Sequence, residues 1–417
     1  MGKNLGGSNP GMRKKLDGRW TMLILLFIGM IEATVNWFSV VDAIPYLEAI
    51  YHIGIVSIGF LASAFVISFS IFMLPSGILS NRFGPRKAMA AGFVMESVGS
   101  IMSAFSPNFQ ILLISRIVGG FGGSIVIIVT MGVINIWFRG KEISLANGLA
   151  STAAFAMGAA LIIGLGFPII SLLGLSNYFL ATGLSELLVC IFVIYLFRLP
   201  KGNARLSGGR ITISDVREVI KNRLLLLIGI SVLGAYGENY VMATILPTYA
   251  QHVLGFSNSL SSVVSIAVFS AGLPAGLFGG LLTDRRKSVK ATFIASMILT
   301  GLSLLLILPY PAITIWFAAV LAGFFFRSGF AAFVSTPAIL PGISEHNIPL
   351  ASGFIMTLAS SGAFIMPIIF GYIALVSYST AWTVVSITCI ALASIFFFLP
   401  EPYRVPSAKG KERTGAT

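Results

Sequence analysis

Four charged side chains interrupt apolar stretches that are otherwise long enough to cross a bilayer. They are Glu32, Arg116, Glu238 and Arg327. An ionised group at the centre of a bilayer costs on the order of 3 kcal/mol even on the most lenient insertion scale, so such residues need a partner or water and often mark function. Two acids and two bases could neutralise one another. A guanidinium could instead hold a carboxylate or oxyanion through two parallel hydrogen bonds.

Membrane-spanning helices are the elements that must position these charges. Hydrophobic residues make up 56% of the 417-residue chain and charged residues only 10%, and the mean hydropathy is +0.95, far outside the range of soluble proteins. Crossing a bilayer takes about 20 mostly apolar residues. Such runs predict two sets of six helices, at 19–46, 52–76, 87–106, 109–138, 143–173 and 177–198, and at 223–249, 258–283, 289–309, 312–340, 348–376 and 379–400. The first run is too long for the apolar core of a secretory signal, so it is the first transmembrane helix.

The distribution of Lys and Arg predicts the orientation of these helices. Apart from Arg116 and Arg327, every Lys and Arg falls on one side of the predicted membrane: at the N-terminus, in the loops near 82–87, 139–141, 198–223 and 285–290, and in the tail from Arg404. Cytoplasmic loops of membrane proteins carry this excess of positive charge. We therefore expect a multi-pass plasma membrane protein with both termini in the cytoplasm. The net charge of +13 reflects orientation and not a nucleic-acid partner.

The two halves of the chain repeat each other. Three pairs of segments match at corresponding places: Asn36 to Pro45 with Glu238 to Pro247, Gly77-Ile-Leu-Ser-Asn-Arg82 with Gly280-Leu-Leu-Thr-Asp-Arg285, and Leu145-Ala-Asn-Gly148 with Leu350-Ala-Ser-Gly353. Matches in register indicate that a six-helix unit was duplicated. We expect an N-terminal bundle at 1–199, a basic linker at 200–222 and a C-terminal bundle with a short tail at 223–417. In the linker, Thr212 and Asp215 have the spacing of a capping box ahead of a short surface helix.

Two segments also carry recognisable motifs. The sequence Gly77-Ile-Leu-Ser-Asn-Arg-Phe-Gly-Pro-Arg-Lys87 follows the second predicted helix, and Arg116 precedes Gly119, Gly120 and Gly122 in the fourth. With twelve predicted helices, these segments resemble the major facilitator superfamily across nearly the whole chain. The resemblance implies an all-α polytopic membrane protein with 12 transmembrane helices, in two six-helix bundles related by a pseudo-two-fold axis, that moves a solute by alternating access. The residues that it associates with conformational change are Gly77, Asn81, Arg82, Gly84, Arg86, Arg116, Asp284 and Arg285.

One position departs from the family's pattern. The family usually has an aspartate in the loop after helix 2, where this chain has Asn81, whereas the second copy of the loop retains Asp284. In the family, this acid is thought to latch the N-terminus of a neighbouring helix in the outward-open state, an interaction that the positive end of the helix dipole favours. We therefore expect a weaker latch in the N-terminal half and a larger role for the copy in the C-terminal half.

The resemblance also implies that helices 1, 4, 7 and 10 line a central cavity, and each of these carries one of the four buried charges. We predict that Arg327 lies at the substrate site. Glu32 or Glu238 would carry a coupling proton, because a carboxyl that is neutral when buried can ionise beside an arginine. With a rise of about 1.5 Å per residue, Glu32 lies at the depth of Arg327, and Arg116 lies at the depth of Glu238. Polar and aromatic neighbours would complete the substrate site: Asn36, Trp37, Tyr236, Asn239 and Tyr240.

The leading hypothesis is a proton-coupled transporter of a small organic or inorganic anion that works as a monomer without a cofactor. The alternative is a proton-antiporting drug or metabolite exporter. Many such exporters carry a Gly-Pro motif in helix 5, and the segment from Ala146 to Pro168 does not reproduce it. A non-transporting sensor on the same fold would need an added domain, for which we expect no room at either end of the chain.

Enzymatic chemistry has the least support in the sequence. The three histidines, His52, His252 and His346, lie in or near predicted loops, and Cys190 and Cys389 lie in separate apolar runs without metal-ligand spacing. We find no nucleophile or phosphate-binding constellation. We therefore predict no catalytic residue and no metal site, and the expected partners are a small solute, protons and the lipid bilayer.

Overall fold

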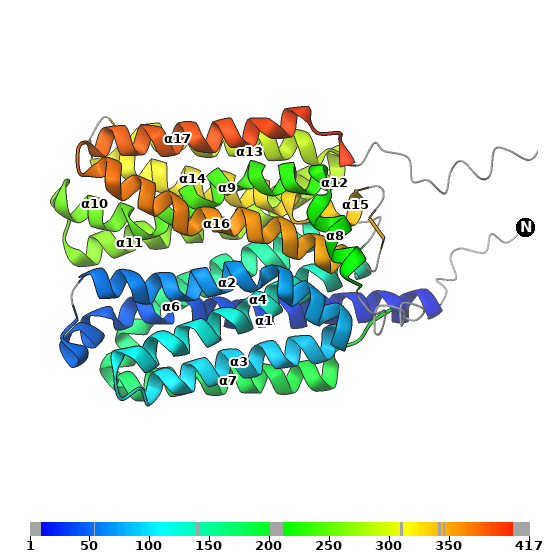
Figure 1. The fold of residues 1–417 in the computed structure, drawn as a ribbon, viewed down its shortest axis with the longest axis horizontal. Coiled ribbons are helices and arrows are strands. Elements are labelled where there is room, and N and C mark those ends of the chain that lie inside the picture. Colours follow the sequence, from blue (N-terminus) through cyan, green and yellow to red (C-terminus); the bar gives the residue numbers. More distant parts are fainter. Residues whose placement is uncertain are drawn as a thin grey trace, which may run out of the picture.

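The structure is a computed structural model that describes residues 10–53, 55–138, 142–200, 212–308, 312–340, 343–344 and 347–402. Nearly all of this described part is helical (Figure 1). The N-terminal half holds α1 (Pro10–Tyr51), α2 (Ile55–Phe83), α3 (Pro85–Ala104), α4 (Phe109–Trp137), α5 (Ile143–Asn147), α6 (Ala154–Leu173) and α7 (Leu175–Leu196). The C-terminal half holds α9 (Arg223–Thr244), α10 (Leu246–His252), α11 (Asn258–Ser270), α12 (Gly272–Arg286), α13 (Val289–Leu304), α14 (Ala312–Phe333), α15 (Thr336–Ile339), α16 (Ile348–Ala374) and α17 (Tyr378–Ser394).

The helices form two bundles that lie side by side. Figure 1 shows the N-terminal half below, in blue to green, and the C-terminal half above, in green to red. In the first bundle α3 packs against α4 and α7, and in the second α9 packs against α16 and α17. The halves meet where α2 packs against α16 and where α5 packs against α12. The predicted fold class, an all-α membrane protein built from two six-helix bundles, is confirmed.

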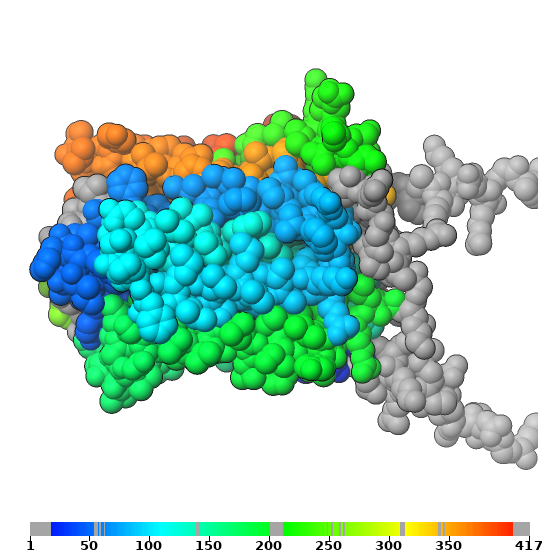
Figure 2. All heavy atoms as spheres, turned by 60° about the horizontal axis from the view of Figure 1, so that its bottom comes forward, coloured from blue at the N-terminus to red at the C-terminus, as the bar shows by residue number. Residues whose placement is uncertain are grey.

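Most of these helices are apolar enough to lie in a bilayer. Within the described residues, 11 spans are long and apolar enough to cross a membrane. The twelfth spanning helix is α3, whose 20 residues are less apolar because they include Arg86, Lys87 and Glu96. Figure 2 shows the face on which α2, α3 and α7 lie next to one another, and side chains such as Ile71 and Val98 are exposed on these helices. Such a surface suits the hydrocarbon of a membrane.

Prolines interrupt several spans that the sequence predicts as single helices. In the C-terminal half, α9 gives way to α10 just before Pro247, α11 to α12 just before Pro274, and α14 to α15 just before Pro337. Proline has no N–H group and its ring clashes with the preceding turn, so it breaks a helix at these points. In the N-terminal half, the fifth span instead contains a π-helical segment, Gly148–Ala153. Segments of this kind often mark functional sites.

The helix α8 (Ile213–Lys221), between the two halves, confirms a local prediction. The Thr212 hydroxyl accepts a 3.2 Å hydrogen bond from the Asp215 amide, and the Asp215 carboxylate accepts a 2.7 Å bond from the Thr212 amide, as in a capping box. The remainder of the predicted linker at 201–211 lies outside the described residues, so the predicted domain boundaries stay a prediction. Helix α8 lies at one end of the molecule (Figure 1), the end at which α2 and α12 finish. The last turns of these two helices carry Arg82 and Arg285, and we call this end the basic end.

The two halves approach each other closely near the basic end, through backbone contacts at glycines. A Cβ atom on Gly77 would lie 2.7 Å from the carbonyl oxygen of Pro349, and one on Gly280 would lie 2.5 Å from that of Ser144. Gly77 and Gly280 are equivalent in the sequence repeat, so the same contact occurs twice. A larger residue at either position would have to separate the halves. The basic end is therefore closed in this structure.

Replacing Gly280 by alanine should open the basic end. The added methyl group has no room against α5, and overpacking of this kind costs roughly 1–3 kcal/mol, so the closed population should fall about fivefold or more relative to the open one. Spin labels at the exposed positions Phe83 and Arg286 would report the distance between the halves at this end. Gly371→Ala is the control, because nothing lies within 4 Å of a Cβ there. An unchanged distance distribution in Gly280→Ala would contradict this account of the closed end.

Candidate functional site

A small cavity between the two halves collects most of the predicted substrate-binding residues. It is lined by Trp37, Phe38, Phe155, Tyr236, Asn239, Tyr240, Ala243, Phe269, Phe326 and Arg327. Of the predicted substrate-binding residues, Asn36 alone is missing from this lining. The free volume of about 20 Å³ is enough for a water molecule and too small for an organic solute. The side chains have therefore closed around the centre in this state.

Aromatic rings form most of the cavity wall and join the two halves. The ring of Phe38 in α1 lies 5.0 Å, centre to centre, from that of Phe269 in α11, and Phe155 of α6 lies 6.3 Å from Phe269. These contacts have the geometry of favourable aromatic pairs. Sequence reasoning missed these rings and Phe326, because nothing in the pattern sets them apart from the other members of a set of 33 phenylalanines.

Arg327 of α14 presents its guanidinium to this cavity without an acid beside it. The side chain is only 5% exposed, Nη2 donates a long 3.4 Å hydrogen bond to Asn239 Oδ1, and Nε has no partner. The guanidinium carbon lies 4.4 Å from the ring centre of Phe155 and 5.2 Å from that of Phe326, within cation–π range. No carboxylate in the described part of the chain forms an ion pair with it. A guanidinium has five N–H donors, so several remain for a ligand.

Arg116 of α4 is equally buried and its Nε also has no partner, but the protein itself uses the donors of both terminal nitrogens. Nη1 lies 3.1 Å from the carbonyl oxygen of Asn36, and Nη2 lies 2.6 Å from that of Trp37. The guanidinium also lies over the ring of Phe65 at 4.8 Å. Arg116 therefore ties α4 to α1 directly behind the cavity wall. The expectation that the four buried charges neutralise one another is wrong, since neither buried arginine forms an ion pair with an acid among the described residues.

The two predicted proton carriers lie away from the cavity. Glu238 of α9 is fully buried and neither of its carboxyl oxygens has a hydrogen-bond partner; it interacts electrostatically with the thiol of Cys389 in α17. Glu32 of α1 accepts a 2.9 Å hydrogen bond from the hydroxyl of Ser185 in α7. Neither acid lines the cavity, and their coupling role stays a prediction.

Asn36 points away from the cavity, into a group of polar side chains inside the N-terminal bundle. Its Nδ2 donates to Glu186 Oε1 at 2.7 Å and to Ser100 Oγ at 2.8 Å. Its amide also bonds the backbone carbonyl of Glu96, whose fully buried carboxyl oxygens have no partner. Successive residues on a helix point about 100° apart, so Trp37 faces the cavity while Asn36 does not. The substrate and proton sites predicted from the sequence include neither Glu96 nor Glu186, although each interrupts an apolar run.

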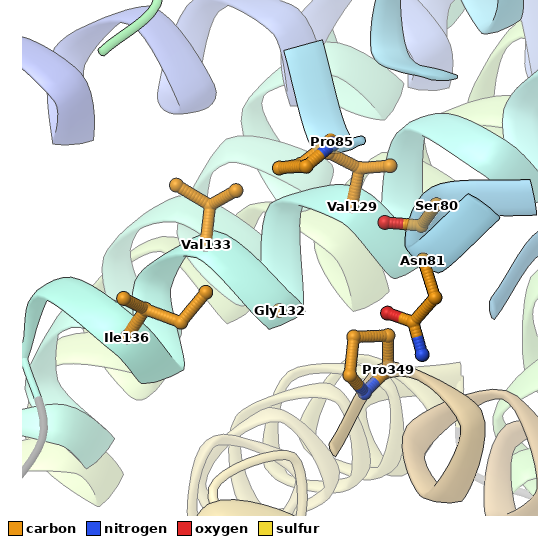
Figure 3. Close-up of a pocket in the computed structure, with 8 residues that line it drawn as sticks. All are labelled: Ser80, Asn81, Pro85, Val129, Gly132, Val133, Ile136 and Pro349. Atoms are coloured by element: carbon orange, nitrogen blue, oxygen red, sulfur yellow. The ribbon is translucent and has the colours of Figure 1, made fainter. Parts of the chain in front are cut away.

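The two predicted latches at the basic end differ from each other. The Asp284 carboxylate accepts a 3.2 Å hydrogen bond from the Ser144 amide and a 2.8 Å bond from the Leu145 amide, at the start of α5. Figure 3 shows the equivalent place in the other half, where the Asn81 side chain points toward Pro349 at the start of α16, beside a cavity of about 10 Å³. Pro349 stands at the position of Ser144 in the sequence repeat, and a proline has no N–H to donate. The N-terminal half therefore lacks both the charge and one of the donors.

The other motif residues surround these latches. Gly84 has a φ of 83°, which glycine adopts without a steric penalty, and α3 begins directly after it. Arg82, Arg86 and Arg285 are exposed at the basic end, and Arg82 lies over the ring of Phe83 at 5.4 Å. No group of three or more His, Cys, Asp or Glu among the described residues is placed to hold a metal ion.

Two membrane bundles enclose an aromatic-walled cavity at their interface and meet in close contacts at the basic end. This is the architecture of a secondary transporter. The family model of the Major Facilitator Superfamily matches residues 25–326 and 230–416, and the chain belongs to that superfamily.

Two solved structures share the fold. One is FucP, a transporter of the same superfamily in the outward conformation, with 14% sequence identity, a TM-score of 0.74, and coverage of 90% of this chain and 97% of that chain. The other is XylE, a proton:xylose symporter bound to 6-bromo-6-deoxy-D-glucose, with 16% identity, a TM-score of 0.71, and coverage of 93% of this chain and 97% of that chain. Family and fold point to transport of a small molecule rather than to enzymatic activity.

The two buried arginines should respond in opposite ways to replacement by glutamine. Arg116→Gln removes charged donors from two α1 carbonyls, so we expect a loss of roughly 1.5–3 kcal/mol and a lower melting temperature in detergent. Arg327→Gln removes a buried charge that has no counter-ion, so the melting temperature should stay the same or rise. A fall as large as that of Arg116→Gln would mean that Arg327 is structural.

Asp284→Asn should destabilise the closed basic end. The interaction of a carboxylate with a helix N-terminus is worth about 0.3–2 kcal/mol, so distances between labels at Phe83 and Arg286 should shift toward an open state. Asn81→Ala is the matched change in the other half and should have a smaller effect, because that latch already has no charge. An equal or larger shift in Asn81→Ala would show that the two latches are equivalent after all.

Proposed function

We propose that this protein is a secondary transporter that moves a small organic anion with a planar, apolar body, together with protons. The observation that supports this is the uncompensated guanidinium of Arg327 in an aromatic-walled cavity between the halves. A carboxylate or another oxyanion would take two parallel hydrogen bonds from the guanidinium. Binding would then neutralise a buried charge, which favours an anion over a neutral solute.

The rest of the lining supports the same class of ligand. Besides Arg327, the polar side chains around the cavity are those of Asn239, Tyr236 and Tyr240, and the remaining surfaces are mostly Trp and Phe rings. A sugar with many hydroxyl groups would leave several of them unsatisfied against such walls. A carboxylate on an aromatic or short aliphatic body fits one charged group and several ring faces. A cationic drug would be repelled by Arg327, which disfavours the exporter alternative.

Alternating access supplies the movement in this proposal. With Asp284 bonded to the start of α5, the cavity is closed toward the basic end, and release of this contact would open it to that side. By the positive-inside rule the basic end faces the cytoplasm, with both termini on that side and the protein in the plasma membrane as a monomer. Proton coupling is supported by the buried carboxyl groups inside the N-terminal bundle and by the shared fold with the proton:xylose symporter XylE.

Three ligands with the same ring and different charge test the proposal: benzoate, neutral benzamide and cationic benzylammonium. Benzoate should raise the melting temperature of the purified protein by a few degrees, since occupancy at about ten times the dissociation constant adds roughly 1.4 kcal/mol of stability. Benzamide and benzylammonium should have little effect, because they cannot neutralise Arg327. The measurement is a thermal-shift assay at neutral pH, where benzoate is ionised.

Variants of Arg327 provide the controls for this assay. Arg327→Gln should abolish the benzoate effect, and Arg327→Lys should retain only part of it because lysine lacks the planar fork that holds a carboxylate with two bonds. Arg116→Gln should show the same benzoate-induced rise, starting from a lower melting temperature. Stabilisation by benzylammonium alone would overturn the anion proposal and favour the exporter.

A further inference from the structure

A second buried polar centre lies inside the N-terminal bundle, between α1, α3 and α7. Glu186 of α7 accepts a 2.7 Å hydrogen bond from Asn36 Nδ2, and its Oε2 lies 3.4 Å from the hydroxyl of Ser100. Glu96 of α3 is also fully buried, and both of its carboxyl oxygens lack a hydrogen-bond partner. The two carboxyl groups interact electrostatically. Unpartnered oxygens on a buried acid beside a second buried acid leave an acceptor position that a proton can fill.

We propose that Glu96 and Glu186 together form the proton-binding site of this transporter. A proton from water adds to one carboxylate oxygen to give a neutral carboxylic acid, and it returns to water when that O–H bond breaks. Two interacting carboxylates that are buried out of water, and that form no ion pair among the described residues, cannot both stay charged at an acceptable cost, so the pair shares one proton. Only the link from this site to substrate rests on the proposed anion transport.

The groups that face this pair come from every neighbouring element. From α1, Glu32 adds a third acid that interacts with both members of the pair, which favours the retention of a proton. From α4, Arg116 is the nearby cation, yet it forms no ion pair and bonds backbone carbonyls instead. Helix α4 also packs directly on Glu96: a Cβ on Gly122 would lie 2.8 Å from Glu96 Cγ, and one on Gly123 3.1 Å from Glu96 Oε1. This close packing leaves no room for water on that side.

Helix α1 connects the carboxyl pair to the cavity. Asn36 bonds Glu186, the next residue Trp37 lines the cavity, and Arg116 bonds the carbonyl oxygens of both. Arg116 also interacts electrostatically with Tyr240 of α9, in the other half of the cavity wall. A neutral Glu186 is a weaker hydrogen-bond acceptor than a charged one, so protonation loosens the hold on Asn36 and alters how α1 presents Trp37 to the substrate.

The lone acid of the C-terminal bundle has no such connection. Glu238 has no hydrogen-bond partner, does not line the cavity, and has the thiol of Cys389 as its electrostatic neighbour. Glu238 is therefore the matched control. It is as deeply buried as Glu96 and lies inside the other bundle, but no second acid in the described part of the chain interacts with it.

A double-mutant cycle tests the shared proton without any ligand. The melting temperature of the wild-type protein should fall as the pH rises from neutral to alkaline, because the native state loses the shared proton. Glu96→Gln and Glu186→Gln should each reduce that fall, and the double variant should show less than the sum of the two single effects, since the proton on each acid depends on the charge of the other. The effect of Glu238→Gln on the pH dependence of the melting temperature should add to the effect of either Glu96→Gln or Glu186→Gln. Additive effects of Glu96→Gln and Glu186→Gln would show two independent acids and overturn the proposal.

Proton uptake on ligand binding tests the link to substrate. Benzoate is added to the protein in unbuffered detergent solution at an alkaline pH at which the melting measurements show that the native state has lost the proton, and a pH-indicator dye reports the protons taken up per bound benzoate. The wild type and Glu238→Gln should take up close to one proton, whereas Glu96→Gln and Glu186→Gln should bind benzoate without uptake. Uptake that persists in both of these variants, or disappears in Glu238→Gln, contradicts the proposed link. If benzoate does not bind the wild type, the anion proposal fails, and the melting cycle still decides the proton site.

Discussion

The absence of water in the core of a bilayer is the constraint on which this structure depends. Each polar group there must be met by another group of the protein, and the buried charges of this chain meet that demand in different ways. Arg116 donates to backbone carbonyls of α1, and Glu186 accepts hydrogen bonds from side chains of two other helices. Arg327 differs from Arg116, since rings surround it and one long hydrogen bond is its only polar contact among the described residues. This difference between the two buried arginines is the basis of our proposal that Arg327 binds a solute.

At the basic end, the steric contacts between the halves follow the sequence repeat, whereas the electrostatic contact does not. The glycine contacts at Gly77 and Gly280 occur in both halves and have nearly the same geometry, so the closed state is defined by packing that follows the pseudo-two-fold repeat. The charged latch at Asp284 exists in one half only, because its counterpart is Asn81 facing a proline. Packing therefore sets which two arrangements are possible, and the charge of Asp284, which has no counterpart in the other half, sets how strongly the chain prefers one of them. A bias of about 1 kcal/mol is enough to change such a preference severalfold.

The sequence predicted the spans and the repeat, because apolar length and charge distribution are local properties that depend on the bilayer alone, and it predicted half of the cavity lining. It did not predict which face each helix turns inward. Asn36 and Trp37 are neighbours in the chain and were both assigned to the substrate site, yet the rotation of α1 sends them to different places. Helix breaks before Pro247 and Pro337 were missed for a related reason, since a proline in a membrane span either bends or breaks a helix according to its tertiary neighbours.

The separation of the two proposed sites has a physical consequence for coupling. If proton and anion shared one cavity, the acid would compete with the substrate for Arg327, and each opening of the cavity would expose the proton to water. In this chain the carboxyl pair lies behind α1 and is covered by the glycine surface of α4. Communication must then pass through the position of α1, whose backbone is held by Arg116 on one side and whose Asn36 is held by Glu186 on the other. Coupling of this kind acts through a helix with two arrangements, as allosteric coupling generally requires. If both proposals hold, Arg116, which lies outside the cavity lining, would transmit the coupling between the proton and the substrate.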